Sequence, residues 1–156
     1  MKLPQLESRR VQAIMELCSN AAQGVPTDKS QWKPEGLGKS VHEILEHLAG
    51  ANHGFAALIR GGALSETAKK SVDRQSIKNP AASYPHAVEA LRESGQALAE
   101  AIASVPDEQL RQERPMPWGE TWAVTRLLTA PSAHIAYHWG QICYLQTLWG
   151  DQEDRF

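Results

Sequence analysis

The stretch that decides the fold is VEALRESGQALAEAIASV, residues 88–105. Its apolar and small residues recur at alternating intervals of three and four positions, in the order Val88, Leu91, Gly95, Leu98, Ile102 and Val105. This spacing is typical of the seam along which one helix of a bundle packs against its neighbours. We therefore predict a helix over residues 83–104, ended by Pro106, with Gly95 permitting the close approach of a second helix.

Two earlier segments carry the same helical periodicity. Residues 4–23 repeat apolar side chains every three or four positions, and glycine and proline follow them. Ser40 and Glu43 form the sequence pattern of a capping box, which predicts a helix start at that point. This second helix is expected to continue to Arg60, before a glycine pair.

The last helix is expected over residues 121–149, with Pro131 either kinking it or marking the junction of two segments. No segment shows sustained strand alternation. We therefore expect an all-α fold, a four-helix bundle that forms one domain over residues 1–156. In this bundle, residues 61–82 and 106–120 are two long connecting loops, and long loops often cover a site.

Composition narrows the possible partners. The net charge of −2 over 156 residues gives no basic surface for nucleic acid or for an anionic membrane, and neither is expected as a partner. No apolar run is long enough to span a bilayer. Cys18 and Cys143 lie far apart in predicted helices and are expected to be reduced. We expect a cytoplasmic protein whose nearly neutral surface favours a homodimer.

The last predicted helix contains HIAYHWGQ, residues 134–141, with two histidines four positions apart. At about 100° per residue, His134, His138 and Gln141 all point along the apolar stripe that includes Leu145. Buried imidazoles are costly unless another group satisfies them. Two adjacent imidazoles can bind one metal ion, but they need a third ligand from elsewhere.

The second predicted helix offers three histidines as the third ligand. His47 lies about 80° from the core direction of that helix, at the edge of its buried face. His42 and His53 lie about 140° to 160° away and are expected in solvent. The residues thus favour a metal site of His47, His134 and His138. Histidines satisfied by side chains or buried water, and haem ligation, remain alternatives.

Three segments resemble the DinB/YfiT-like family: the Trp32-Lys-Pro tripeptide, SVHEILEHLAGANHGF at residues 40–55 and HIAYHWGQICYL at residues 134–145. The resemblance covers nearly the whole chain, including the PWG turn at residues 117–119. It implies a four-helix bundle, commonly dimeric. It also implies a divalent metal ion, Zn²⁺ or Ni²⁺, held by the same three histidines that the helical positions select.

The resemblance implies a metal-dependent hydrolase or a low-molecular-weight-thiol transferase acting on a small molecule. The family often has histidine where this chain has Tyr137 and arginine where it has Trp139, so both residues are candidates for the substrate pocket. Gln141 is expected to orient a histidine or a bound water, or to bond across the helix interface. No general base can be named, because Glu43 caps a helix and Glu46 is expected in solvent. The catalytic residues are therefore unknown, and a non-catalytic bundle that binds metal or another ligand is the alternative.

Overall fold

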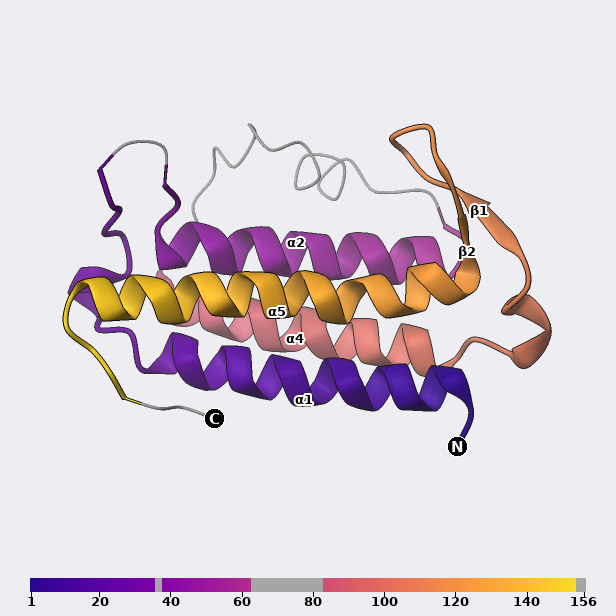
Figure 1. The fold of residues 1–156 in the computed structure, drawn as a ribbon, viewed down its shortest axis with the longest axis horizontal. Coiled ribbons are helices and arrows are strands. Elements are labelled where there is room, and N and C mark those ends of the chain that lie inside the picture. The colour runs from indigo at the N-terminus through magenta and orange to yellow at the C-terminus, as the bar shows by residue number, and fades with distance from the viewer. Residues whose placement is uncertain (36–37, 63–82, 154–156) are drawn as a thin grey trace.

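The computed structural model describes residues 1–35, 38–62 and 83–153. Within these ranges the chain forms four long helices that lie side by side as a bundle (Figure 1). They are α1 (Leu3–Gln23), α2 (Val41–Ile59), α4 (Tyr84–Ala103) and α5 (Val124–Leu148). The predicted all-α bundle is confirmed. The first of the two predicted loops lies mostly outside the described residues.

The helices pack around the bundle in the order α1, α4, α2, α5. Helix α1 packs against α4 and α5, and α2 packs against the same two helices, so α1 and α2 occupy opposite corners. Along its length α2 packs more closely against α4 than against α5. The α2–α5 edge is therefore the more open of the two edges that α2 forms.

Helix α4 supplies the centre of the core through the predicted seam. Leu91, Leu98 and Ile102 are fully buried. A Cβ atom at Gly95 would lie 2.5 Å from Cε of Met15, a distance that real contacts do not allow. The close helix approach expected at Gly95 is confirmed, with α1 as the second helix.

The predicted capping box begins α2. The Ser40 hydroxyl accepts a hydrogen bond from the Glu43 backbone N–H, and the Glu43 carboxylate accepts one from the Ser40 N–H. Both bonds satisfy amides that have no partner within the helix. They fix the start of α2 six residues before His47.

A small antiparallel hairpin precedes α5, and this corrects two expectations. Strands β1 (Glu113–Pro115) and β2 (Thr121–Ala123) pair with Arg114 opposite Trp122. The predicted turn at residues 117–119 joins them, with Gly119 at a φ of +91°. The last helix, expected to start near residue 121, begins instead at Val124, and the loop expected over residues 106–120 contains β1. Three-residue strands are too short to show an alternation in sequence.

Helix α5 continues through Pro131 without interruption, so the junction of two segments was also wrong. Proline removes one backbone donor, but burial of Pro131, Ser132 and Ile135 stabilises the helix around it. Neither Cys18 nor Cys143 forms a disulfide within the described ranges, in agreement with the expectation that both are reduced. None of the helices in the described ranges is both long and apolar enough to cross a membrane.

Candidate metal centre

Three histidines from two helices meet at the α2–α5 edge. His47 comes from α2, whereas His134 and His138 come from successive turns of α5. One potential ligand nitrogen from each lies within 4.8 Å of the other two. The structure thus brings together the histidines that the sequence analysis selected.

The spacing of the nitrogens fits a single metal ion. The Nε2 atoms of His47 and His134 are 3.2 Å apart. Two imidazoles bound tetrahedrally to zinc at about 2.0–2.1 Å hold their nitrogens about 3.3 Å apart. The rings pack edge to face, with the His138 ring centre 4.7 Å from each of the other two. The cluster is therefore compact enough for all three side chains to share one ion.

Gln141 fixes the orientation of His138. The protonated Nδ1 of His138 donates to Oε1 of Gln141 at 2.6 Å. This bond places the lone pair of His138 on Nε2, as in many metal sites where the second ring nitrogen is held by a hydrogen bond. The Gln141 amide nitrogen in turn donates to the Tyr137 hydroxyl at 3.1 Å. Among the predicted roles of Gln141, the structure shows a hydrogen bond to a histidine of its own helix.

The surroundings keep the imidazoles of α5 neutral. Burial is the main cause that lowers the pKa of His134 to about 4, and repulsion from the neighbouring His138 and Lys39 contributes to this value. Burial also lowers the pKa of His138, helped by Lys39 and opposed by the bond to Gln141. Neutral imidazole is the form that binds a metal ion.

One nitrogen of the cluster has no hydrogen-bond partner. Nδ1 of His134 is buried and unbonded among the described residues. On one side, the ring packs against Phe55, with 6.0 Å between ring centres. A buried polar atom without a hydrogen-bond partner costs stability, and no described residue compensates the burial of this nitrogen.

His47 and His138 open into a groove of about 1000 Å³ at the α2–α5 edge. The other lining residues are Pro34, Gly38, Lys39, Ile44, Tyr137, Gln141, Tyr144, Leu145 and Leu148. Of the two predicted pocket residues, Tyr137 is among them, and Gln141 lines the groove beside it. Trp139 is not, because its side chain points toward the hydrophobic core and is partly buried there.

Several residues that line the groove were not predicted from the sequence. Tyr144 and Leu148 share the three- and four-residue spacing of Tyr137 and Gln141, so the helical period was the signal for them. Lys39 lies just before the capping residue of α2, in a segment that no helical wheel can place.

His42 and Glu46 correct the expectation that both are solvated. His42 is only 2% exposed; its Nδ1 accepts from Nε2 of Gln31 at 2.8 Å, and its ring packs against Tyr84. Its Nε2 lies 3.6 Å from Oε1 of Glu46, whose side chain is 11% exposed. Helix α2 is covered by α4, by α5 and by the segment before it. A helical wheel with a single buried direction therefore could not predict which of its residues are buried. His53 is exposed, as expected.

Several solved structures have a fold similar to that of this chain. A DinB-like protein from Bacillus subtilis has a TM-score of 0.74 at 16% identity, over 97% of this chain and 96% of that one. The mycothiol-dependent maleylpyruvate isomerase has a TM-score of 0.70 at 13% identity over 91% of this chain, which spans 61% of that protein. A mutant of that isomerase gives the same values. No curated protein sequence matches the chain.

At these identities the solved structures establish the fold alone. The family match is broader evidence, because it extends over residues 11–142 and includes all three histidines. The chain therefore belongs to the DinB superfamily.

Proposed function

We propose that the protein is a metal-dependent enzyme that acts on a small molecule through a divalent ion held by His47, His134 and His138. The observation that carries the proposal is the convergence of three imidazole nitrogens within 4.8 Å at the wall of a groove of about 1000 Å³. Three nitrogen ligands leave at least one coordination position for water or substrate. Zn²⁺ and Ni²⁺, the ions that we propose, are among those that an all-imidazole donor set suits.

A bound ion would supply Lewis acidity, lowering the pKa of a water or a thiol at its open position. The protein's own contribution is to hold the ligands. Gln141 keeps His138 in the tautomer whose Nε2 faces the cluster, and Tyr137 holds Gln141. The described groove lining contains no carboxylate, so neither aspartate nor glutamate is a candidate general base there.

Two reaction classes fit this site: hydrolysis, and transfer or isomerisation that uses a low-molecular-weight thiol. The similar fold of a mycothiol-dependent isomerase supports the second class. Both need the same open coordination position, so the proposal covers them together. A non-catalytic bundle that binds metal or another ligand is the alternative, and the missing general base favours it.

We also propose a cytoplasmic homodimer. The lack of a disulfide between Cys18 and Cys143 in the part of the chain that the structure describes fits a reducing compartment. Leu6 and Trp118, which lie outside the groove lining, expose apolar surface, and the nearly neutral net charge produces little repulsion between two copies of the chain. Light scattering coupled to size-exclusion chromatography measures the mass, and a monomer at micromolar concentration would contradict the dimer.

The first test is elemental analysis of protein purified without a histidine tag. We expect about one Zn²⁺ or Ni²⁺ per chain in the native protein and in the His53→Ala variant, whose histidine is exposed on the same helix. His134→Ala should lose the metal while its helical circular dichroism stays unchanged. A native protein that binds neither ion after reconstitution would contradict the proposal.

A second measurement separates the enzyme from the structural alternative. Cobalt-substituted protein should develop a thiolate-to-cobalt charge-transfer band when a small thiol such as 2-mercaptoethanol is added, because the thiol enters an open position. A spectrum that does not respond to thiol would indicate a closed, structural site.

A further inference from the structure

The groove beside the three histidines has one formally charged side chain in its described lining, and it is positive. This side chain is Lys39, which lines the groove next to Gly38 and just before the first turn of α2. The remaining lining residues are histidine, tyrosine, glutamine, proline, glycine and aliphatic side chains. The groove therefore offers a cation and no anion to a ligand.

Lys39 lacks a counterion within the described parts of the chain, where it forms no ion pair and no side-chain hydrogen bond. Lys33, which reaches the same end of α2, differs because its ammonium group pairs with the Glu43 carboxylate. Lys39 is also partly buried. A partly desolvated ammonium group without a protein partner is best satisfied by an anion from outside.

Lys39 lies close enough to the histidine cluster to share a ligand with it. The groove that Lys39 lines also contains His47 and His138. One small molecule lying in the groove can therefore meet the ammonium group and the cluster together.

The walls between these polar groups are apolar. Ile44 and Leu145 are buried and present aliphatic surface from α2 and α5 respectively. Tyr144 and Leu148 extend the α5 wall, and they are 65% and 46% exposed. Large side chains with that much exposure leave apolar surface for a ligand to cover.

We propose that Lys39 is a substrate-anchoring residue that binds a carboxylate, so that the site takes a small monoanion with an apolar body. The carboxylate would pair with the Lys39 ammonium group, and the body would lie along Ile44, Leu145 and Leu148. A single lysine, with no arginine and no second cation in the described lining, matches one negative charge better than a phosphate dianion. The catalytic meaning of this anchor rests on the proposed metal-dependent function, whereas the binding itself does not.

The test compares two probes of nearly equal shape, 4-phenylbutyrate and its neutral amide, by isothermal titration at pH 8. Dissociation constants are measured for zinc-loaded protein and for protein kept metal-free with a chelator. We expect the native protein to prefer the carboxylate about tenfold in both forms. Lys39→Met should remove that preference, Lys39→Arg should keep it, and Lys33→Met should leave it unchanged. Circular dichroism verifies that each variant is folded.

The possible results separate this proposal from the metal-dependent function. A carboxylate preference that appears only with zinc and survives Lys39→Met would mean that the anion binds the metal; it would overturn the role of Lys39 and leave the function intact. A Lys39-dependent preference in a protein that binds no metal would support the anchor and contradict the metal-dependent function. Equal binding of the two probes, or no binding of either, would overturn the proposal.

Discussion

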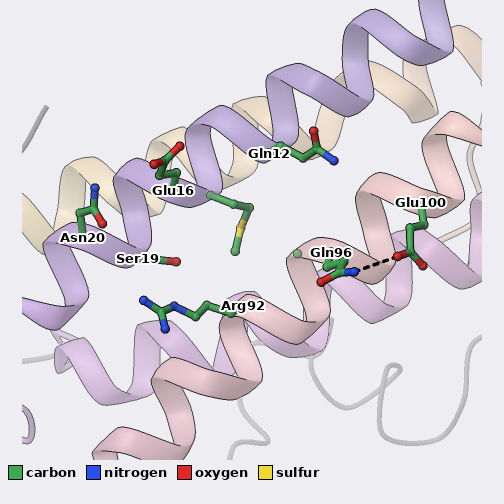
Figure 2. Close-up of a pocket in the computed structure, with 9 residues that line it drawn as sticks. Gln12, Glu16, Ser19, Asn20, Arg92, Gln96 and Glu100 are labelled. Carbon is green, nitrogen blue, oxygen red and sulfur yellow. Dashed lines mark hydrogen bonds between the residues drawn. The ribbon is translucent and has the colours of Figure 1, made fainter.

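Two grooves lie on opposite edges of the bundle, and both contain polar side chains. The α2–α5 groove contains His47 and His138 of the three-histidine cluster. The α1–α4 groove, of about 450 Å³, is lined by Gln12, Met15, Glu16, Ser19, Asn20, Arg92, Gly95, Gln96 and Glu100. Figure 2 shows its polar side chains spread along the two helices, with the Gln96 amide bonded to Glu100 of the same helix.

The difference between the grooves lies in the convergence of the side chains. In the α1–α4 groove, carboxylates and a guanidinium group occupy exposed helix faces, while Met15 and Gly95 close the space beneath them. In the α2–α5 groove, three nitrogens of one chemical type from two helices approach within 4.8 Å. A groove with polar side chains thus indicates a metal-binding or catalytic site when ligand atoms from separate helices converge within a few ångströms.

The largest expected effect is on stability and lies beneath the α1–α4 groove. Gly95→Leu should lower the free energy of unfolding by about 3 kcal/mol, because its side chain would overlap Met15 in a closely packed interface. Urea denaturation of metal-free protein measures the change. Gly140→Ala is the matched control in α5. Its Cβ would meet no atom within 4 Å, so it should raise stability by about 1 kcal/mol. Equal effects of the two substitutions would show that the helices do not differ in closeness of packing.

The next effect belongs to the α2–α5 groove and depends on pH. His134 has a pKa of about 4 in the folded protein against an ordinary value of 6.5, so below pH 6.5 the unfolded chain binds a proton that the folded chain does not. The stability of metal-free protein should be unaffected by this group above pH 6.5 and decline as pH falls toward 4. At pH 5 the loss should be about 2 kcal/mol.

Other groups also titrate in this range, so the measured quantity is the difference between the native protein and His134→Phe. Urea denaturation at pH 7.5 and pH 5.0 should show a smaller pH-dependent loss in the variant, by about 2 kcal/mol. Parallel losses in the two proteins would contradict the burial of His134 in its neutral form.

Most of the fold could be predicted from the helical period, the three- and four-residue spacing of apolar side chains in the sequence. It placed the helices within a few residues at most ends, and it put Gly95 on a contact seam that the structure confirms against Met15. The capping pattern of Ser40 and Glu43 is equally local and is also confirmed. Each of these features depends on residues close together in sequence.

The helical period could not predict the burial of residues that contact more than one neighbouring element. His42 was expected in solvent because a helical wheel has one core direction, yet Gln31 and Tyr84 cover it from two other segments. Lys39 lies outside any helix, so its place in the groove depends on how the preceding segment folds back. The histidines at 134 and 138 were easier to place, since one helix sets both.

The smallest expected effect is on zinc affinity. It tests whether the hydrogen bond between Gln141 and the proposed metal ligand His138 contributes to binding, or whether any glutamine in a groove would have the same effect. Gln141→Leu removes the acceptor that holds Nδ1 of His138, so zinc should bind about tenfold to a hundredfold more weakly, as when other ligand-orienting groups are lost. Gln141→Glu keeps an acceptor and should bind zinc nearly as well as the native protein. Gln96→Leu is the matched variant in the α1–α4 groove, where the glutamine bonds only Glu100, and it should leave zinc affinity unchanged. Competition with a chromophoric chelator measures all three affinities. If Gln141→Leu and Gln96→Leu behaved alike, the bond to His138 would be incidental, and the three imidazoles would be oriented by packing alone.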